Sequence, residues 1–305
     1  MKANELNIDD AVAELRRGCL VGMPTETVYG LAGDASNPHA VSAIFKLKNR
    51  PHFNPLIAHV SSLEMAELQA VFSETAKALA LHYWPGPLTL VLPVASTNSI
   101  CDLARAGLDT QALRFPSHPL ARNLIESFGA PIVAPSANKS GRISPTKRDH
   151  VSSEFGGDLP IILDGGVSVL GLESTVLFID DNQVTLLRSG TLTREEIEGV
   201  VGPISSSLDD DTAPRSPGML SRHYAPEAKL RLNVTKPHED ENLLGFGECE
   251  AKVSLNLSPS GNLQEAAANL YAMLRELDSY SSAIAVSPIP DTGIGVAINE
   301  LTCSQ

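Results

Sequence analysis

Short apolar runs recur along the first two hundred residues, with segments of helical spacing between them. The run at 20–23 ends at Pro24, which cannot donate to a sheet, and similar runs predict buried strands at 56–60, 88–92, 131–134, 161–163, 175–179 and 184–187. Apolar spacing predicts helices after the cap Asn37, over 73–82, and over 119–128 with Ser117 as cap. This alternation predicts an α/β fold with a twisted, mixed or mostly parallel sheet and flanking helices.

The periodic pattern stops between Gly202 and Pro226, where serine, aspartate and proline dominate. We therefore expect a large domain at 1–202, a linker at 203–228 and a small C-terminal α/β domain at 229–305. In the last part, strands are predicted at 230–234, 253–257 and 283–287, and a helix at 263–277. A unit of about 75 residues is near the lower limit for independent stability, so we expect it to pack on the large domain.

Polar residues follow the first apolar run and the first long helix. Thr25 and Thr27 fall on the turn where the strand at 20–23 ends, and α/β sheets bind ligands at such strand exits. Lys48 and Arg50 follow the helix, where extended backbone would place both side chains on one side to clamp a triphosphate. The alternative is a pair of surface cations that favour the helix dipole. Neither standard glycine-rich phosphate loop occurs, so such cations would carry more of the phosphate binding.

Other candidate residues have both a chemical and a structural interpretation. Ser136, Asn138 and Ser144 follow strand ends or a glycine turn and suit hydrogen bonds to phosphate or ribose, but they are equally typical of turns and caps. The planar guanidinium of Arg114 suits bidentate binding of an amino-acid carboxylate. His59 lies in a predicted strand, where a single histidine is more often structural than catalytic.

Composition narrows the function classes. A formal net charge of −13 disfavours broad electrostatic binding of nucleic acid, so we expect direct tRNA binding to be weak or absent. The four cysteines are scattered and indicate neither a zinc site nor a disulfide framework. No apolar run approaches the roughly 20 residues needed to span a bilayer, and the first twenty residues lack the pattern of a signal peptide. We therefore expect a cytoplasmic protein that does not bind membranes.

A series of ordered motifs resembles the YrdC-domain family of threonylcarbamoyl-AMP synthases. The motifs over about 10–202 are Pro24-Thr-Glu-Thr-Val-Tyr-Gly-Leu31, Lys46-Leu-Lys-Asn-Arg-Pro51, Asn54-Pro-Leu-Ile-Ala-His59, Tyr83-Trp-Pro-Gly-Pro-Leu-Thr-Leu90, Arg114-Phe-Pro116, Ala134-Pro-Ser-Ala-Asn138, Ser140-Gly141, Ser144-Pro-Thr146, Leu172-Glu-Ser-Thr-Val176 and Leu187-Arg-Ser-Gly190. Ser216-Pro-Gly-Met219 and His223-Tyr-Ala-Pro226 resemble the linker of the family's long, two-domain branch.

The resemblance implies a reaction and a set of binding residues. Members of this family condense L-threonine, bicarbonate and ATP to threonylcarbamoyl-AMP and pyrophosphate, as the first step towards threonylcarbamoyladenosine beside the tRNA anticodon. The product would pass to the tRNA threonylcarbamoyl transferase complex. The implied ATP contacts are Arg50, Asn54, Thr110, Ser136, Ser144, Arg188 and Tyr224, and the implied threonine contacts are Thr27, His59, Arg114, the backbone of Ala134, and Ser174.

Two further expectations concern the metal and the linker. Mg²⁺ should accompany ATP, but no carboxylate cluster in the sequence identifies its ligands, so phosphate oxygens and water are expected to hold most of it. Tyr224 in the linker is expected to fold over the pocket and exclude water from labile intermediates, and the alternative is a simple tether.

Two other functions remain possible at the level of the sequence. One is a carbamoyl-adenylate-forming module like that of hydrogenase maturation factors, which the Tyr224 linker disfavours. The other is an RNA-binding protein, which the negative charge and an aromatic content of 5% disfavour. The tail after Ala297 lacks the arginine-rich end of related sequences, so the role of the small domain is open.

Overall fold

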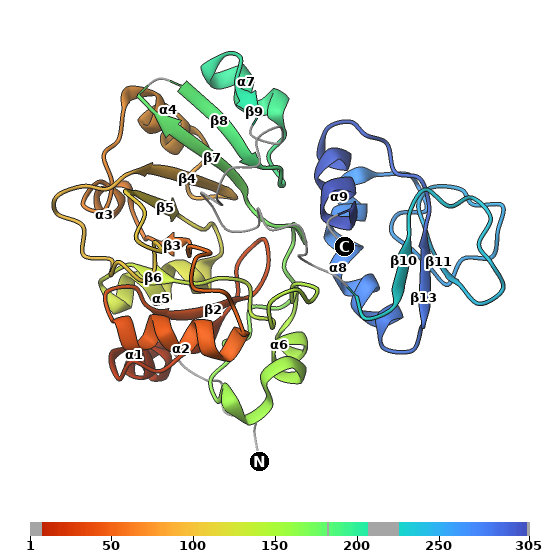
Figure 1. The fold of residues 1–305 in the computed structure, drawn as a ribbon, viewed down its shortest axis with the longest axis horizontal. Coiled ribbons are helices and arrows are strands. Elements are labelled where there is room, and N and C mark those ends of the chain that lie inside the picture. The colour runs from red at the N-terminus through yellow and green to blue at the C-terminus, as the bar shows by residue number, and fades with distance from the viewer. Residues whose placement is uncertain (1–7, 182, 207–225, 304–305) are drawn as a thin grey trace.

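The computed structural model describes residues 8–181, 183–206 and 226–303. Its first domain is built on a mixed sheet of nine strands in the order β1-β2-β6-β3-β5-β4-β7-β8-β9 (Figure 1). The strands are β1 (Val21–Met23), β2 (Gly30–Asp34), β3 (Ala58–His59), β4 (Leu88–Pro93), β5 (Thr110–Arg114), β6 (Ile132–Val133), β7 (Thr175–Asp180), β8 (Gln183–Arg188) and β9 (Ser205–Ser206). The predicted mixed α/β sheet is confirmed.

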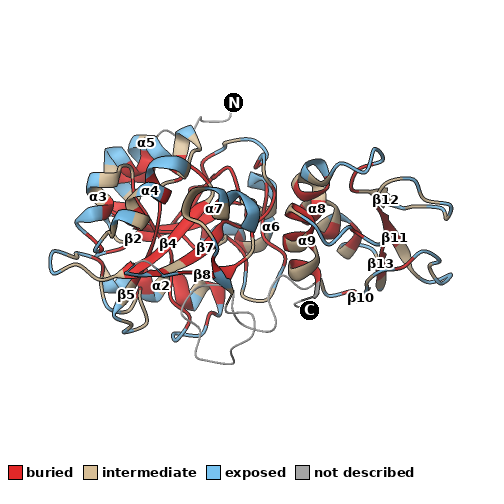
Figure 2. Cartoon of the chain, turned by 90° about the horizontal axis from the view of Figure 1, so that it is seen from above, coloured by how far each residue is buried: buried red, intermediate tan, exposed pale blue. Residues whose placement is uncertain are grey.

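Helices pack against this sheet through two apolar clusters. The helices are α1 (Ile8–Arg16), α2 (Pro38–Lys48), α3 (Leu63–Glu67), α4 (Glu74–Tyr83), α5 (Pro119–Phe128), α6 (Arg148–Phe155) and α7 (Arg194–Val201), with a 3-10 turn at Gly156–Asp158. One cluster joins α1 and α5 to β1 and β2, and the other joins α2 and α4 to the central strands. Strand β2 therefore lies between α1 and α2, whereas one face of β4, β5, β7 and β8 carries a separate small apolar cluster without helix residues. The outer faces of the helices meet solvent (Figure 2).

The sequence pattern located helices α2, α4 and α5 and six strands of this domain, but it did not predict helices α1, α3, α6 and α7 or strands β2, β5 and β9. Asn37 caps α2 as predicted, and its side chain accepts a hydrogen bond from the backbone of His39. The cap of α5 is His118, not Ser117, because the His118 ring accepts from the backbone of Leu120. Residues 161–163 form no regular strand, since Ile162 makes only an isolated bridge to Gly22.

The C-terminal domain has a parallel sheet in the order β10-β13-β11-β12, with two helices. Its elements are β10 (Lys229–Arg231), β11 (Asn242–Gly245), β12 (Leu255–Asn256), α8 (Leu263–Asp278), β13 (Ala283–Val286) and α9 (Ile294–Cys303). Helices α8 and α9 lie between this sheet and the first domain (Figure 1). As expected for so small a unit, it packs on the first domain, because Val28, Ile143 and Leu172 belong to its apolar cluster.

The predicted linker, 203–228, is described only at its two ends. Strand β9 pairs with β8, so the first sheet extends to residue 206. Tyr224 and the motifs beginning at Ser216 and His223 lie outside the described residues.

Among the described residues, no helix is long and apolar enough to cross a membrane.

Candidate active site

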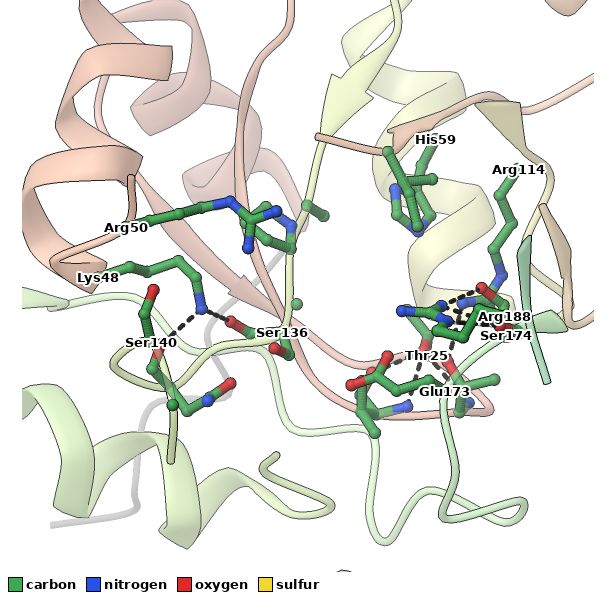
Figure 3. A pocket seen from close by; sticks show the side chains of 18 residues that line it. Thr25, Lys48, Arg50, His59, Arg114, Ser136, Ser140, Glu173, Ser174 and Arg188 are labelled. Atoms are coloured by element: carbon green, nitrogen blue, oxygen red, sulfur yellow. Dashed lines mark hydrogen bonds between the residues drawn. The ribbon is translucent and has the colours of Figure 1, made fainter. Parts of the chain in front are cut away.

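A cleft lies beside the short central strands of the first domain. The side chains that line it come from the β1–β2 turn, the C-terminal end of α2, strands β3 and β5, the segments after β6 and before β7, and the end of β8. In Figure 3, Lys48, Arg50, Ser136 and Ser140 occupy one side of the opening, and His59, Arg114, Ser174 and Arg188 occupy the other. Segments that are far apart in the sequence therefore meet around one space.

Arg114 is held by a buried network at the end of β5. Its Nη2 donates to Oε1 of Glu26 at 2.7 Å, and its Nη1 donates to the hydroxyl of Thr27 at 2.8 Å. Its Nε donates to the carbonyl of Gly86 at 3.3 Å. Burial alone would raise the pKa of Glu26, but the charge and hydrogen bond of Arg114 outweigh it and hold the pKa below its usual range. The site therefore contains a fixed guanidinium with one carboxylate already beside it.

The strand-exit turn that carries Thr27 is closed by hydroxyl groups. The Thr25 hydroxyl donates to the carbonyl of Val28 at 2.6 Å and lies 2.9 Å from the hydroxyl of Thr27. Thr25, Thr27 and the neighbouring His59 are all buried and line the cleft. Burial, and then the charge of Arg114, lower the pKa of His59 to about 3. The imidazole is therefore neutral at physiological pH.

Ser174 and Arg188 form a second hydrogen-bonded pair on the same side of the cleft. Nη2 of Arg188 donates to the carbonyl of Ser174 at 2.8 Å and to its hydroxyl at 3.0 Å. The Ser174 hydroxyl also lies 2.8 Å from that of Thr89 on β4. Figure 3 shows Arg188 on the same side of the cleft as Arg114, so β5 and β8 each contribute a guanidinium group to that side.

Lys48 and Arg50 enter the cleft from the end of α2, but their backbone is not extended. Asn49 between them is a left-handed cap with φ 51°, and its backbone N–H bonds to carbonyls of the last turn. The two side chains nevertheless reach one side of the cleft, as predicted (Figure 3). Sequence periodicity does not reveal such a cap, and for this reason the prediction of extended backbone at these residues was wrong.

Lys48 is more buried than a surface phosphate clamp would be. Its Nζ donates to the carbonyl oxygens of Ser136 and Asn138, and its exposed fraction is 1%. Burial, and then the charge of Arg50, lower the pKa of Lys48 to about 7. Arg50 donates to the carbonyls of Asn54 at 3.2 Å and Pro55 at 2.9 Å. Lys48 thus fixes the segment after β6, and Arg50 fixes the loop after α2.

Some of the candidate residues from the sequence do not line the cleft. Asn54, Thr110 and Ser144 are not among the residues that line the cleft, while Ala134, Ser136 and Asn138 are. Thr110 begins β5, at the opposite end from Arg114. Asn54 is fully buried behind Arg50, and its side-chain amide makes no hydrogen bond within the described part of the chain. Tyr224 lies outside that part.

The sequence reasoning missed two buried carboxylates, Glu26 and Glu173. Glu173 lines the cleft, is 7% exposed and accepts a hydrogen bond from the Ser144 hydroxyl at 2.7 Å. Each lies next to a candidate residue, since Glu26 precedes Thr27 and Glu173 precedes Ser174. An acidic residue inside an otherwise buried motif was the signal that could have identified both.

Residues 8–181, 183–206 and 226–303 contain no group of three or more His, Cys, Asp or Glu side chains that would hold a metal ion.

Two family models together match nearly the whole chain. The model described as "Telomere recombination" matches residues 13–190, and the model described as "Threonylcarbamoyl-AMP synthase, C-terminal domain" matches residues 192–300. The second model begins close to the end of β8 and covers the small domain, as expected for the long branch of the family.

Individual relatives agree with both models. The threonylcarbamoyl-AMP synthase of Bacillus subtilis is 40% identical over 320 residues, covering 98% of this chain and 92% of the relative. That of Pyrococcus abyssi is also 40% identical, covering 97% and 93%. A crystal structure of P. abyssi Sua5 complexed with L-threonine matches with a TM-score of 0.90 at 37% identity, over 100% of this chain and 95% of that one. The chain therefore belongs to the two-domain threonylcarbamoyl-AMP synthases, nucleotidyltransferases that act in the threonylcarbamoyladenosine modification of tRNA.

Proposed function

We propose that the two sides of the cleft divide the substrates of this ATP-using synthase. L-threonine binds on the side of Thr27, His59, Arg114, the backbone of Ala134, and Ser174. The triphosphate binds on the side of Lys48, Arg50, Ser136 and Asn138, and Arg188 reaches it from across the opening. The observation that carries this proposal is the presence of cationic groups on both sides of a single cleft that is also lined by serine and threonine hydroxyls (Figure 3).

Buried polar atoms without protein partners support the nucleotide side. Oδ1 of Asn138, which lines the cleft, is buried and makes no hydrogen bond within the described residues. The side-chain amide of Asn54, which lies behind the lining, also has no partner there. A buried polar group without a partner costs about 1–3 kcal/mol, which a ligand or water would recover. Both residues contact a cation: Arg50 donates to the backbone carbonyl of Asn54, and Lys48 donates to the backbone carbonyl of Asn138.

The neutral state of His59 supports the threonine side. A neutral imidazole next to Arg114 can accept or donate a hydrogen bond to the threonine hydroxyl without adding charge. Glu26 holds the Arg114 guanidinium in place for the threonine carboxylate, although the negative charge of Glu26 itself would repel that carboxylate. A relative of known structure, P. abyssi Sua5, is complexed with L-threonine, and we extend that ligand to this cleft.

The chemistry needs positioning more than a nucleophilic side chain. The threonine nitrogen bonds to the carbon of bicarbonate and water leaves, which produces a carbamate. A carbamate oxygen then attacks the α-phosphorus of ATP, and the bond from that phosphorus to the pyrophosphate oxygen breaks. Arg50 and Lys48 stabilise the charge that develops on the phosphates.

Magnesium fits the cleft as a companion of ATP, at a carboxylate that lies across the opening from Lys48 and Arg50 (Figure 3). Mg²⁺ is usually held by one or two carboxylates together with substrate phosphates and water. Glu173 is the carboxylate that lines the cleft, and its Oε1 is oriented by the Ser144 hydroxyl. When bound, the ion would neutralise phosphate charge, and Glu173 would supply one oxygen ligand.

The wider setting follows from the reaction. We place the enzyme in the cytoplasm, where it would pass its labile product to the tRNA threonylcarbamoyl transferase complex. With a net charge of −13, direct tRNA binding would be weak or absent. Residues 1–202 would form the catalytic domain, 203–228 the linker and 229–305 the accessory domain.

Pyrophosphate release from ATP and bicarbonate, with and without L-threonine, tests this assignment. We expect release by the wild-type protein to depend on threonine and to fall at least a hundredfold in Arg50→Ala, the effect of losing about 2.7 kcal/mol of transition-state stabilisation. Arg17→Ala is the matched control, because Arg17 is a surface arginine paired with Glu14. Release that persists in Arg50→Ala would contradict the phosphate assignment, and release without threonine would point to another acceptor.

A further inference from the structure

Helix α8 of the small domain places an arginine against residues 139–144, a segment of the first domain that reaches the cleft at Ser140 and Gly141. Arg275 lies in the last turn of α8, and 15% of its side chain is exposed. Its Nη2 donates to the carbonyl of Ile143 and its Nε donates to the carbonyl of Ser144 at 3.3 Å. Both acceptors belong to the first domain, so a charged side chain from one domain binds the backbone of the other.

A buried glutamate fixes the opposite end of the same segment. Glu154 of α6 accepts a hydrogen bond from the backbone N–H of Lys139 at 3.0 Å, and 4% of its side chain is exposed. Its Oε2 also lies 3.5 Å from Nη2 of Arg275. Residues 139–144 are thus held at one end by Glu154 and at the other by Arg275, and these two groups attract each other.

The inner side of this segment faces the cleft. Ser140 and Gly141 line the cleft directly. The N–H of Ser140 donates to the carbonyl of Lys48, the last residue of α2, at 2.7 Å. The hydroxyl of Ser144 donates to Glu173 at 2.7 Å. A shift of the segment at its outer side would therefore move atoms on the nucleotide side of the cleft.

Apolar contacts hold α8 firmly in this place. Val28, Ile143 and Leu172 of the first domain are buried in the same cluster as Leu270 and Leu274 of α8. Gly171 approaches α8 so closely that a Cβ atom there would lie 2.6 Å from the carbonyl oxygen of Ala267. Because α8 is packed this tightly, Arg275 is presented from a fixed surface and not from a loosely attached domain.

We infer that Arg275 is a positioning residue of the synthase, which holds residues 139–144 from the small domain so that the nucleotide side of the cleft keeps its shape. The inference rests on the proposed binding of ATP along this side. It gives the small domain a direct role in the reaction, because that domain supplies the donor to the Ile143 and Ser144 carbonyls. A surface arginine would contribute little, but Arg275 is mostly buried and its contacts are directed at backbone atoms.

Kinetics of Arg275→Met in the full-length protein test the inference, with separate titrations of ATP and L-threonine. We expect the KM for ATP to rise about tenfold, equivalent to about 1.4 kcal/mol, and the KM for threonine to change less than twofold. Arg275→Lys keeps the charge but cannot reach both carbonyls and Glu154, so its ATP KM should be intermediate. Arg231→Met is the control, because it removes an arginine paired with Glu241 within the small domain.

The alternatives give different results. If Arg275 only stabilises the packing of the domains, thermal unfolding of Arg275→Met shifts to lower temperature while both KM values stay at wild-type levels, and the inference is wrong. A rise in the threonine KM alone would also overturn it. If Arg275→Met does not fold, Arg275→Lys decides by the same criterion. Failure of the proposed function itself would be visible in the wild-type protein, as pyrophosphate release that does not depend on threonine.

Discussion

Removing Arg114 should affect stability and threonine binding through two separable effects. In the structure, the side chains of Arg114 and Glu26 are 4% and 5% exposed and form an ion pair at 2.7 Å. Arg114→Met leaves the Glu26 carboxylate buried without its cation. Breaking a buried pair in this way costs about 3–5 kcal/mol. We therefore expect the free energy of unfolding at pH 7 to fall by about that amount.

The effect of Arg114→Met on threonine binding is separate from its effect on stability. If Arg114 binds the threonine carboxylate, the variant also loses at least one charge-assisted hydrogen bond to the ligand, which contributes about 1.5–3 kcal/mol. The KM for threonine should rise roughly tenfold to a hundredfold. The KM for ATP should change much less, because the nucleotide side of the cleft is formed by other residues.

A double variant separates the two effects. Arg114→Met/Glu26→Leu removes both charges, and apolar replacement of a buried ion pair is often neutral or stabilising. Urea denaturation should show that most of the lost stability returns, while the threonine KM stays high. Arg17→Met, which breaks an exposed pair with Glu14, should change stability by less than about 1 kcal/mol. A double variant that binds threonine as well as the wild-type protein would refute the role of Arg114 as carboxylate anchor.

Three further predictions follow from single features of the structure. Because the pKa of His59 is about 3 in the folded protein and 6.5 is its ordinary value, the unfolded chain binds an extra proton between these pH values, so stability should fall as the pH drops through this window. Urea titrations of His59→Leu should show a smaller loss, and an unchanged pH slope would contradict the assignment. Lys48, with a pKa of about 7, loses its charge as the pH rises through that value, so kcat/KM for ATP should decline above pH 7. Lys48→Arg should lack this decline. A wild-type kcat/KM for ATP that stays constant from pH 6 to 9 would contradict the role of the Lys48 charge. Gly171→Ala should destabilise the protein by more than Gly166→Ala: both have positive φ, which costs about 1–2 kcal/mol, but a Cβ meets backbone atoms of α8 only at Gly171. Equal losses on urea denaturation would mean that the domain contact contributes nothing.

Part of this fold was predictable from the sequence because some elements depend on short-range patterns. The cap at Asn37 and the helix after it were recognisable from neighbouring residues, and so were the buried strand at Leu88–Pro93 and helix α8. Helices α1, α3, α6, α7 and α9 were not predicted from the pattern, and neither were strands β9, β11, β2 and β5. The positions of β2 and β5 depend on partners that are distant in the sequence, since β2 pairs with β6 and β5 pairs with both β3 and β4.

The site was predictable in composition but less so in its pairings. Motif residues such as Arg50, His59 and Ser174 line the cleft, yet the partner of Arg114 could not be inferred because Glu26 lies 88 residues away in sequence. The contact of Arg275 with the Ile143 carbonyl spans 132 residues and crosses the domain boundary. Such contacts arise only when the order of the strands and the packing of the domains are known.

A crystal structure of the protein with L-threonine and a non-hydrolysable ATP analogue would show directly whether the two substrates bind on opposite sides of the cleft. We expect the threonine carboxylate at Arg114, with the triphosphate along Lys48 and Arg50 and the threonine nitrogen directed towards the α-phosphate. This expectation would be contradicted by a triphosphate bound at Arg114 or by threonine bound outside this cleft.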